Sequence, residues 1–229
     1  MRTPGLFKFF QLSAICGGLF LLQACSDDKA EEIPCTPDRT VFIPQILRNY
    51  FYFDFGSTWT YANANDSDKL DLYQISQSSF STQNNTAMNP DISQPYCYED
   101  YISAFQRYSS PEKEYDSKTR IENSRFNTPL SGTFDVIYSD MNGNTQYIVT
   151  YNPDSTFAKA GPTGTITVLV ADTVLFGRNY KDVIRCSYTN SSNHLYPYSE
   201  VLYARNIGKI QFTLQNGPTW FLKNYTVKQ

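Results

Sequence analysis

The chain contains a single histidine, His194, and imidazole is the side chain most often used for acid–base chemistry near neutral pH. A nucleophilic site would require a serine or Cys186 within hydrogen-bond reach of His194, together with an acid that orients the ring. No spacing in the sequence supports this arrangement, and no Gly-x-Ser-x-Gly segment is present. We therefore predict that His194 is a solvated residue in a polar loop, and we predict no catalytic residue.

Paired carboxylates are the signature of glycoside hydrolysis, and several acidic residues of this chain lie close together in the sequence. Glu99 and Asp100 are adjacent, and on a strand they would face opposite sides. Asp135 and Asp140 flank a predicted hairpin and could approach each other, but capping of the turn explains Asp140 equally well. A carbohydrate-active hydrolase therefore remains only an alternative interpretation.

Tyrosine is unusually abundant, with 18 residues beside 16 phenylalanines and 2 tryptophans. Exposed aromatic rings on a curved sheet can stack on sugars or line an apolar groove. The candidates for such a ligand-binding role are Tyr96, Tyr98, Tyr101, Tyr196 and Tyr198. The alternative is that these rings fill a core that is short of leucine and isoleucine.

The first 24 residues have the features of an export signal. Arg2 and Lys8 form a positive start, and residues 9–22 are mostly apolar. This stretch is shorter than the ~20 apolar residues that a spanning helix requires. We therefore expect a transient signal rather than a permanent membrane helix.

The four residues Leu22-Gln23-Ala24-Cys25 resemble the lipobox of bacterial prolipoproteins. The resemblance implies that the thiol of Cys25 is alkylated with diacylglycerol, that the signal is then cleaved, and that palmitate-type acyl chains hold the mature protein on a membrane. The alternative is an ordinary secretory signal, and Cys16 is discarded with the signal in both cases.

Residues 25–44 are predicted to form a flexible tether, because the acidic run after Cys25 has few apolar side chains to bury. A cysteine followed by acidic residues also resembles the export signal of surface lipoproteins from Bacteroidota-type bacteria. We expect an outer-membrane lipoprotein that faces either the periplasm or the cell surface. Without the signal, 17 of the 19 basic residues face 22 acidic ones, a net charge of −5 that argues against nucleic-acid binding.

Three further cysteines, Cys35, Cys97 and Cys186, lie in the mature chain. In an oxidising envelope an odd number allows one bridge and a free thiol. Cys97 could pair with Cys35 or with Cys186, and the sequence does not choose between them. No CxxC or Cys/His pair has the spacing of metal ligands, so neither a metal nor a cofactor is predicted.

The remaining 45–229 region shows short alternating apolar runs separated by turn residues. Strands are predicted at residues 55–61, 70–75, 98–108, 134–138, 147–151, 165–176, 182–188, 200–204, 209–214 and 219–227, with a loop at 76–95. In the run after Gly208, Ile210 and Phe212 should face the core, whereas Lys209 and Gln211 should face the opposite side. We predict an all-β domain with little helix, in which about nine or ten strands form an antiparallel meander that curves into a half-barrel or sandwich.

Two motifs in this region resemble a group of uncharacterised Bacteroidota envelope lipoproteins. The opening motif is Phe53-x-x-Gly56-x-x-Trp59-x-Tyr61, and the closing motif is Asn-Ile-Gly-Lys-Ile at residues 206–210. The resemblance implies an envelope β domain and brings no assigned activity. We therefore expect a non-catalytic binding or interaction module, whose partner is an envelope protein or a glycan. The alternatives are a carrier of a lipid or other apolar ligand, and a hydrolase.

Overall fold

The computed structural model describes residues 34–84, 97–108, 117–123, 133–139, 145–152, 154–158, 164–169, 172–188 and 197–229. Residues Cys35–Gln229 form one compact unit. The signal segment and Cys25 lie outside the described residues, as do Tyr96, Tyr196, His194 and Asp140. Among the residues that are described, none of the helices is both long and apolar enough to cross a membrane.

Strands dominate this unit, and the described helical segments are a 3₁₀ turn at Pro37–Arg39 and the short helix α1 at Gln45–Phe51. The strands are β1 Thr40–Val41, β2 Thr58–Asn63, β3 Leu70–Asn84, β4 Cys97–Arg107, β5 Ser117–Asn123, β6 Phe134–Ser139, β7 Thr145–Tyr151, β8 Phe157–Ala158, β9 Gly164–Leu169, β10 Thr173–Leu175, β11 Arg178–Tyr180, β12 Val183–Tyr188, β13 Tyr198–Ala204, β14 Gly208–Leu214 and β15 Thr219–Thr226. The predicted all-β class with little helix is confirmed.

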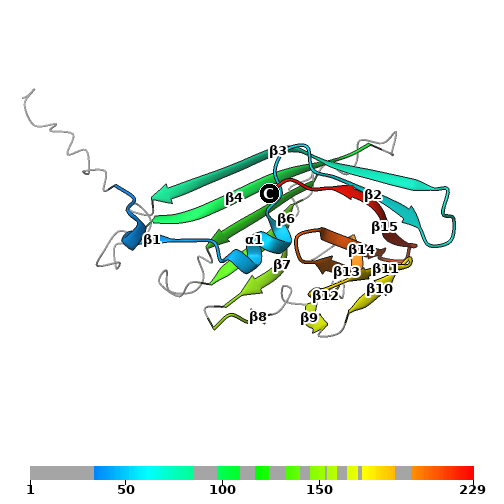
Figure 1. The fold of residues 1–229 in the computed structure, drawn as a ribbon. Coiled ribbons are helices and arrows are strands. Elements are labelled where there is room, and N and C mark those ends of the chain that lie inside the picture. The colour runs from blue at the N-terminus through cyan, green and yellow to red at the C-terminus, as the bar shows by residue number, and fades with distance from the viewer. Residues whose placement is uncertain are drawn as a thin grey trace, which may run out of the picture. The chain divides into compact units, whose positions relative to one another are not determined.

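Sequential antiparallel pairing builds most of the sheet, in the order β8-β7-β6-β5-β4-β3-β2-β15-β14-β13-β12-β9. The last strand, β15, pairs with β2, so the two ends of the strand series meet in the middle of the sheet. Strand β1 adds a parallel pairing to β4, which makes 13 strands in the described sheet, and β10 and β11 form a separate hairpin. The sheet curves into a nearly closed barrel, with β13–β15 curling beneath β2–β4 (Figure 1).

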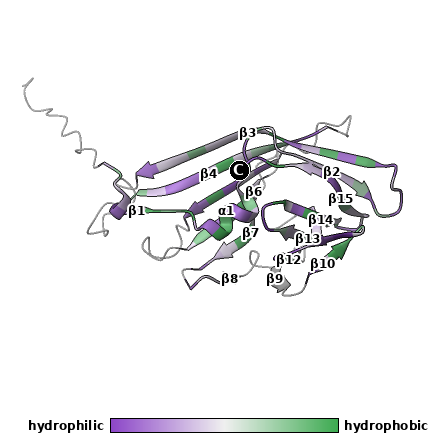
Figure 2. Ribbon diagram, viewed as in Figure 1, coloured by the Kyte–Doolittle hydropathy of each residue, from purple (hydrophilic) through white to green (hydrophobic). Residues whose placement is uncertain are grey.

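The two longest strands, β3 and β4, pair along almost their whole length. Strand β4 covers the strand predicted at residues 98–108 except for its last residue, Tyr108. Residues 76–84, predicted as a loop, instead form the second half of β3, because the neighbouring β4 satisfies their backbone from Gln77↔Ala104 to Asn84↔Cys97. Polar and apolar residues follow one another along both strands in Figure 2. Half-exposed Ser and Thr side chains therefore did not prevent strand formation here.

A disulfide joins Cys35 to Cys97 at the start of β4, with 5.6 Å between the Cα atoms. This is one of the two pairings that the sequence left open. Thr40 and Val41 then pair in parallel with β4, so the chain is already joined to the sheet inside the predicted 25–44 tether. The folded unit therefore begins at Cys35 rather than at residue 45.

The segment at residues 165–176, predicted as one long strand, is interrupted. Strand β9 ends at Leu169, β10 begins at Thr173, and residues 170–171 lie outside the described residues. Phe176 and Gly177 adopt left-handed conformations, with φ of 49° and 72°, which turns the chain into β11. The final strands β12 to β15 lie where the alternation predicted them.

Candidate aromatic pocket

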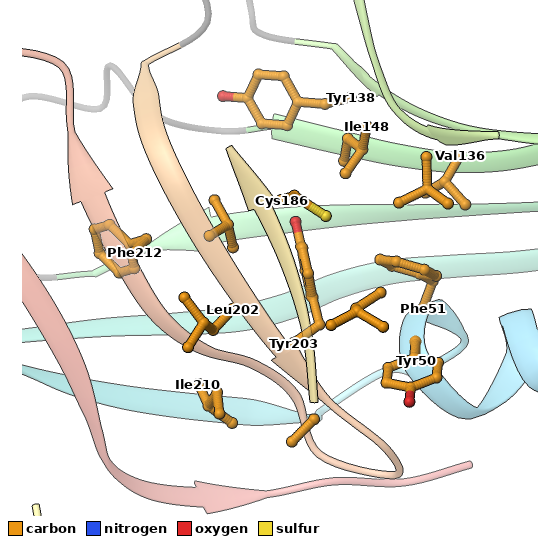
Figure 3. Packing of buried hydrophobic residues seen from close by; sticks show 14 of the residues in the cluster. Tyr50, Phe51, Val136, Tyr138, Ile148, Cys186, Leu202, Tyr203, Ile210 and Phe212 are labelled. Atoms are coloured by element: carbon orange, nitrogen blue, oxygen red, sulfur yellow. The ribbon is translucent and has the colours of Figure 1, made fainter. Parts of the chain in front are cut away.

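A small cavity of about 60 Å³ lies inside the curve of the sheet. Its walls come from α1 and from strands of both halves of the sheet, and 10 of the 15 lining side chains are aromatic, which makes it a predominantly apolar site. Its lining residues are Tyr50, Phe51, Phe53, Trp59, Tyr61, Tyr73, Phe105, Ser117, Thr119, Tyr138, Ile148, Tyr198, Tyr203, Gly208 and Lys209. Figure 3 shows Tyr203 of β13 beside Phe51 of α1, where their ring centroids are 5.0 Å apart.

The opening sequence motif supplies one wall of the pocket through Phe53, Trp59 and Tyr61. Gly56, with φ of 83°, turns the chain between Phe53 and β2. The indole Nε1 of Trp59 donates a 2.7 Å hydrogen bond to the carbonyl of Ile207. The Tyr61 hydroxyl donates a 2.8 Å bond to the carbonyl of Lys209. The two motifs, about 150 residues apart in the chain, therefore hold each other in place.

The closing motif forms the tight connection between β13 and β14. Asn206 and Gly208 both have positive φ, of 60° and 85°, a region that asparagine and glycine tolerate. The amide of Asn206 donates a 2.7 Å bond to the Asn49 carbonyl in α1. A Cβ at Gly208 would lie 2.9 Å from Cε2 of Phe53, so the absence of a side chain lets that ring pack against the turn.

Lys209 lies on the face of the sheet opposite to the one that strict alternation predicted. Leu202 pairs with Gln211, but the next residue, Tyr203, pairs with Lys209, so Ile210 is an extra residue in β14. A β-bulge of this kind shifts the alternation of side chains by one position. Lys209 therefore shares the inner face with its partner Tyr203, and both line the pocket.

The amine of Lys209 is surrounded by aromatic rings. Its Nζ lies 4.8 Å from the ring centroid of Tyr73, 4.8 Å from that of Tyr198 and 4.7 Å from that of Phe212. The Tyr61 ring is 5.7 Å away. Nζ also donates a 3.3 Å hydrogen bond to the Tyr198 hydroxyl. The side chain as a whole retains some solvent contact, although the rings crowd its amine.

Burial lowers the pKa of Lys209 to about 7 from its ordinary value of 10.5, because the rings replace the water that would solvate an ammonium. The negative charge of Asp71 raises the pKa of Lys209, whereas the positive charge of Arg107 lowers it further. Asp71 is engaged by Arg107, whose Nε lies 2.7 Å from its Oδ1. No carboxylate among the described residues lies within 4.0 Å of Nζ. The amine in this pocket therefore loses its proton near neutral pH, at which an ordinary lysine stays protonated.

Of the described tyrosines that the sequence singled out, Tyr98, Tyr101 and Tyr198, only Tyr198 lies in the pocket. Tyr101 is fully buried, and its hydroxyl is bonded to the backbone N–H and carbonyl of Phe53, so it supports the pocket wall from behind. Tyr98 is half-buried on β4 and is not a lining residue. Tyr96 and Tyr196 lie outside the described residues.

The carboxylates considered for hydrolysis have separate structural partners. Glu99 accepts hydrogen bonds from the Ile43 amide and from Arg48. Asp100 is held by both ends of the Arg120 guanidinium, at 3.0 and 2.6 Å. Asp135 accepts a 2.7 Å bond from Thr150.

The structure therefore brings no two of these acids together across a cleft. No group of three or more His, Cys, Asp or Glu side chains that could hold a metal occurs within the described parts of the chain.

Cys186, the one described cysteine outside the disulfide, is fully buried in β12. Burial raises the pKa of its thiol to about 12, so the reactive thiolate is scarce at neutral pH. Cys186 is therefore a core residue and not a nucleophile.

In comparisons with models of known protein families, with curated proteins and with solved structures, this chain matches none. The chemistry of the pocket itself is therefore the basis on which a function can be inferred.

Lys209 was not predicted as a site residue, because its position in an alternating run indicated a solvated face. One signal was available: Lys209 directly follows the Asn-Ile-Gly turn, where bulges are common. The pairing partner that reveals the bulge is known only from the fold.

Proposed function

We propose that this chain is a lipid-anchored envelope protein whose β domain binds a small ligand in its aromatic pocket. The anchor is the diacylglycerol on Cys25, and the acidic residues after it allow the domain to move near an outer-membrane surface. The observation that carries the binding proposal is the pocket itself, in which aromatic side chains surround one amine.

The walls favour a flat, apolar ligand with one polar end. Rings such as Trp59 and Phe105, whose centroids are 5.8 Å apart, offer faces and edges against which a planar group can pack. The hydrogen-bonding side chains of the pocket are Lys209, Ser117, Thr119 and the lining tyrosines, among which Tyr198 contacts the amine of Lys209. A few polar groups in an otherwise apolar cavity orient a ligand and select for it.

The other functions considered from the sequence receive less support. A cavity of about 60 Å³ is smaller than the ~150 Å³ that holds a benzene molecule without adjustment, so even one small ring requires the lining side chains to shift, and the acyl chains of a whole lipid would require far more space than the pocket offers. Stacking on a glycan requires exposed rings, whereas Tyr101 and Tyr198 are buried. Hydrolysis requires a pair of convergent carboxylates, and Glu99 and Asp100 bind different arginines.

Fluorescence of Trp59 provides a direct test, because its indole lines the pocket while Trp220 does not. In a Trp220→Phe background of the full-length protein, Trp59 is the remaining tryptophan. Titration with benzyl alcohol, a small ring with one hydroxyl, should change its emission in a saturable way. Absence of a saturable change with benzyl alcohol and with a set of similar small rings would contradict the proposal.

A matched pair of variants on β5 separates pocket binding from adsorption to the surface. Ser117 lines the pocket, whereas its neighbour Lys118 is exposed on the other side of the strand. Ser117→Phe should fill the cavity and abolish the fluorescence change. Lys118→Phe adds the same ring outside and should leave it intact. Equal effects of the two variants would rule out binding at this site.

A further inference from the structure

We propose that Lys209 captures a small aldehyde or ketone in the aromatic pocket as a Schiff base. This inference rests on the proposed function, because it names the ligand class of the same pocket. The evidence is the position of one amine at the pocket wall, its crowding by rings and its single hydrogen-bond partner.

The first requirement is that a ligand in the cavity can reach the amine of Lys209. Three of the four rings around Nζ, those of Tyr61, Tyr73 and Tyr198, line the cavity, and so does Lys209 itself. The amine therefore lies among side chains that line the cavity, and a ligand in the pocket would approach Nζ past these rings.

The second step concerns the protonation state of the amine. An ammonium has three N–H donors, and among the described residues only the Tyr198 hydroxyl accepts one of them, at 3.3 Å. A carboxylate that could stabilise the charge is present at Asp71, but Arg107 already binds it. Ring contacts compensate for lost hydration only in part, which favours the neutral amine. A lysine that is desolvated in a hydrophobic pocket is the usual form of an amine nucleophile.

The third step is the chemistry, which needs no oxidant or reductant. The lone pair of the neutral Nζ adds to the carbonyl carbon, and the π electrons of the carbonyl move to its oxygen. A proton passes from nitrogen to this oxygen to give a carbinolamine. The hydroxyl then leaves as water while the second N–H proton is lost, and a C=N bond remains. Water reverses the sequence and releases the ligand unchanged.

Tyr198 is placed to move these protons. Its hydroxyl contacts Nζ, and a phenol can both accept a proton from the adding amine and donate one to the departing oxygen. The phenols of Tyr61 and Tyr73 keep their protons throughout the neutral range, because burial raises the pKa of each well above 10. The charges of Asp71 and Arg107 act on the pKa of the amine in opposite directions, the first raising it and the second lowering it.

The test uses the full-length protein with benzaldehyde as the probe, followed by borohydride reduction and peptide mass spectrometry. Reduction converts the imine into a stable benzylamine, so the modified lysine can be identified. We expect labelling of Lys209 near neutral pH to exceed that of the exposed Lys118, Lys181 and Lys223 by about tenfold or more, since an ordinary lysine is almost wholly protonated there. Labelling of Lys209 at or below the level of these three would overturn the proposal.

Two further arms keep the result interpretable. Tyr198→Phe retains the ring but removes the hydroxyl, and it should slow labelling at Lys209 by about tenfold or more. An unchanged rate would exclude Tyr198 as the proton carrier. Benzyl alcohol, which has no carbonyl, should protect Lys209 by competing for the pocket.

The inference and the proposed function can fail separately. If benzyl alcohol changes Trp59 emission but benzaldehyde does not label Lys209, the pocket binds ligands and the Schiff-base inference is overturned. If benzoate then binds with uptake of a proton, the amine serves as an ionic partner instead. If neither ring binds, the proposed function is lost as well.

Discussion

Trp59 Nε1 lies 2.7 Å from the carbonyl oxygen of Ile207, and this hydrogen bond joins the opening motif to the closing motif. Beside it, the ring of Phe53 packs edge-on against Trp59, with centroids 5.2 Å apart, and approaches Gly208. The pocket therefore depends on contacts between segments at the two ends of the strand series. The two motifs therefore stabilise each other's position in the fold, a role that their sequences alone do not indicate.

The first prediction concerns this bond. Trp59→Phe should lower the free energy of unfolding by about 1 to 2 kcal/mol more than Trp220→Phe does. Both changes remove the same atoms from a buried ring, but Trp220 Nε1 has no hydrogen-bond partner among the described residues. Chemical denaturation of the two variants measures the difference. Equal losses would show that the Trp59–Ile207 bond contributes nothing to stability.

The second prediction concerns the turn at Gly208. Gly208→Ala should destabilise the fold by about 2 to 4 kcal/mol, because the new methyl combines a positive φ with a collision against the buried Phe53 ring. Gly177→Ala is the control, since Gly177 also has a positive φ but open space around its Cβ position. It should cost only about 1 kcal/mol. Thermal melting compares them, and an equal loss for both would refute the packing argument.

The third prediction follows from the lowered pKa of Lys209. The unfolded chain holds the lysine proton up to about pH 10.5, whereas the folded chain releases it near pH 7. Between these values the unfolded state binds more protons, so the contribution of Lys209 to stability becomes more favourable as pH rises. Below pH 7 both states are protonated, and the fold bears the full cost of a buried ammonium.

Lys209→Met should therefore stabilise the fold by about 1 to 3 kcal/mol in mild acid, and this gain should shrink toward zero in alkali. This gain in stability is smaller than the whole change in pKa would give, because Lys209 retains some solvent contact. Lys223→Met, on the exposed side of β15, should show no such trend. Urea titrations at several pH values provide the measurement, and a pH-independent gain for Lys209→Met would contradict the lowered pKa.

The fourth prediction concerns attachment to the membrane. Cys25→Ser should abolish labelling of the protein with a fatty-acid analogue and release it in soluble form, because serine cannot form the thioether. Cys16→Ser changes a thiol within the predicted signal and should leave labelling unaffected. Acyl labelling that persists in Cys25→Ser would eliminate the lipobox interpretation, and protease treatment of intact cells would distinguish surface from periplasmic orientation.

Much of the fold could be predicted because alternation of apolar residues is a local signal. The strands β6, β7, β12, β13, β14 and β15 lie close to their predicted positions. Residues 76–84 were missed because their serines, glutamines and threonines carry no alternation, and their strand conformation comes from the backbone of β4. Phe176 was missed because a left-handed phenylalanine has no sequence signature.

The candidate site was harder to predict for a physical reason. Tyr198 was selected as a ligand-binding candidate because it is aromatic, and it does line the pocket. Tyr98 and Tyr101 were selected on the same ground, yet one is half-buried outside the pocket and the other is bonded to the Phe53 backbone. The amino-acid composition gives the number of aromatic side chains, but it does not show which of them lie together in the fold.

The sequence by itself determined the all-β class, the positions of most strands, and a set of cysteines from which one bridge could form. These properties depend on neighbouring residues, so they are encoded locally. Tertiary structure alone decided that Cys35 and not Cys186 pairs with Cys97, that β15 closes onto β2, and that Lys209 faces inward. The last point depends on one extra residue, Ile210, opposite β13. Strand pairing, a long-range property, therefore turned a lysine predicted to be solvated into the amine of the pocket.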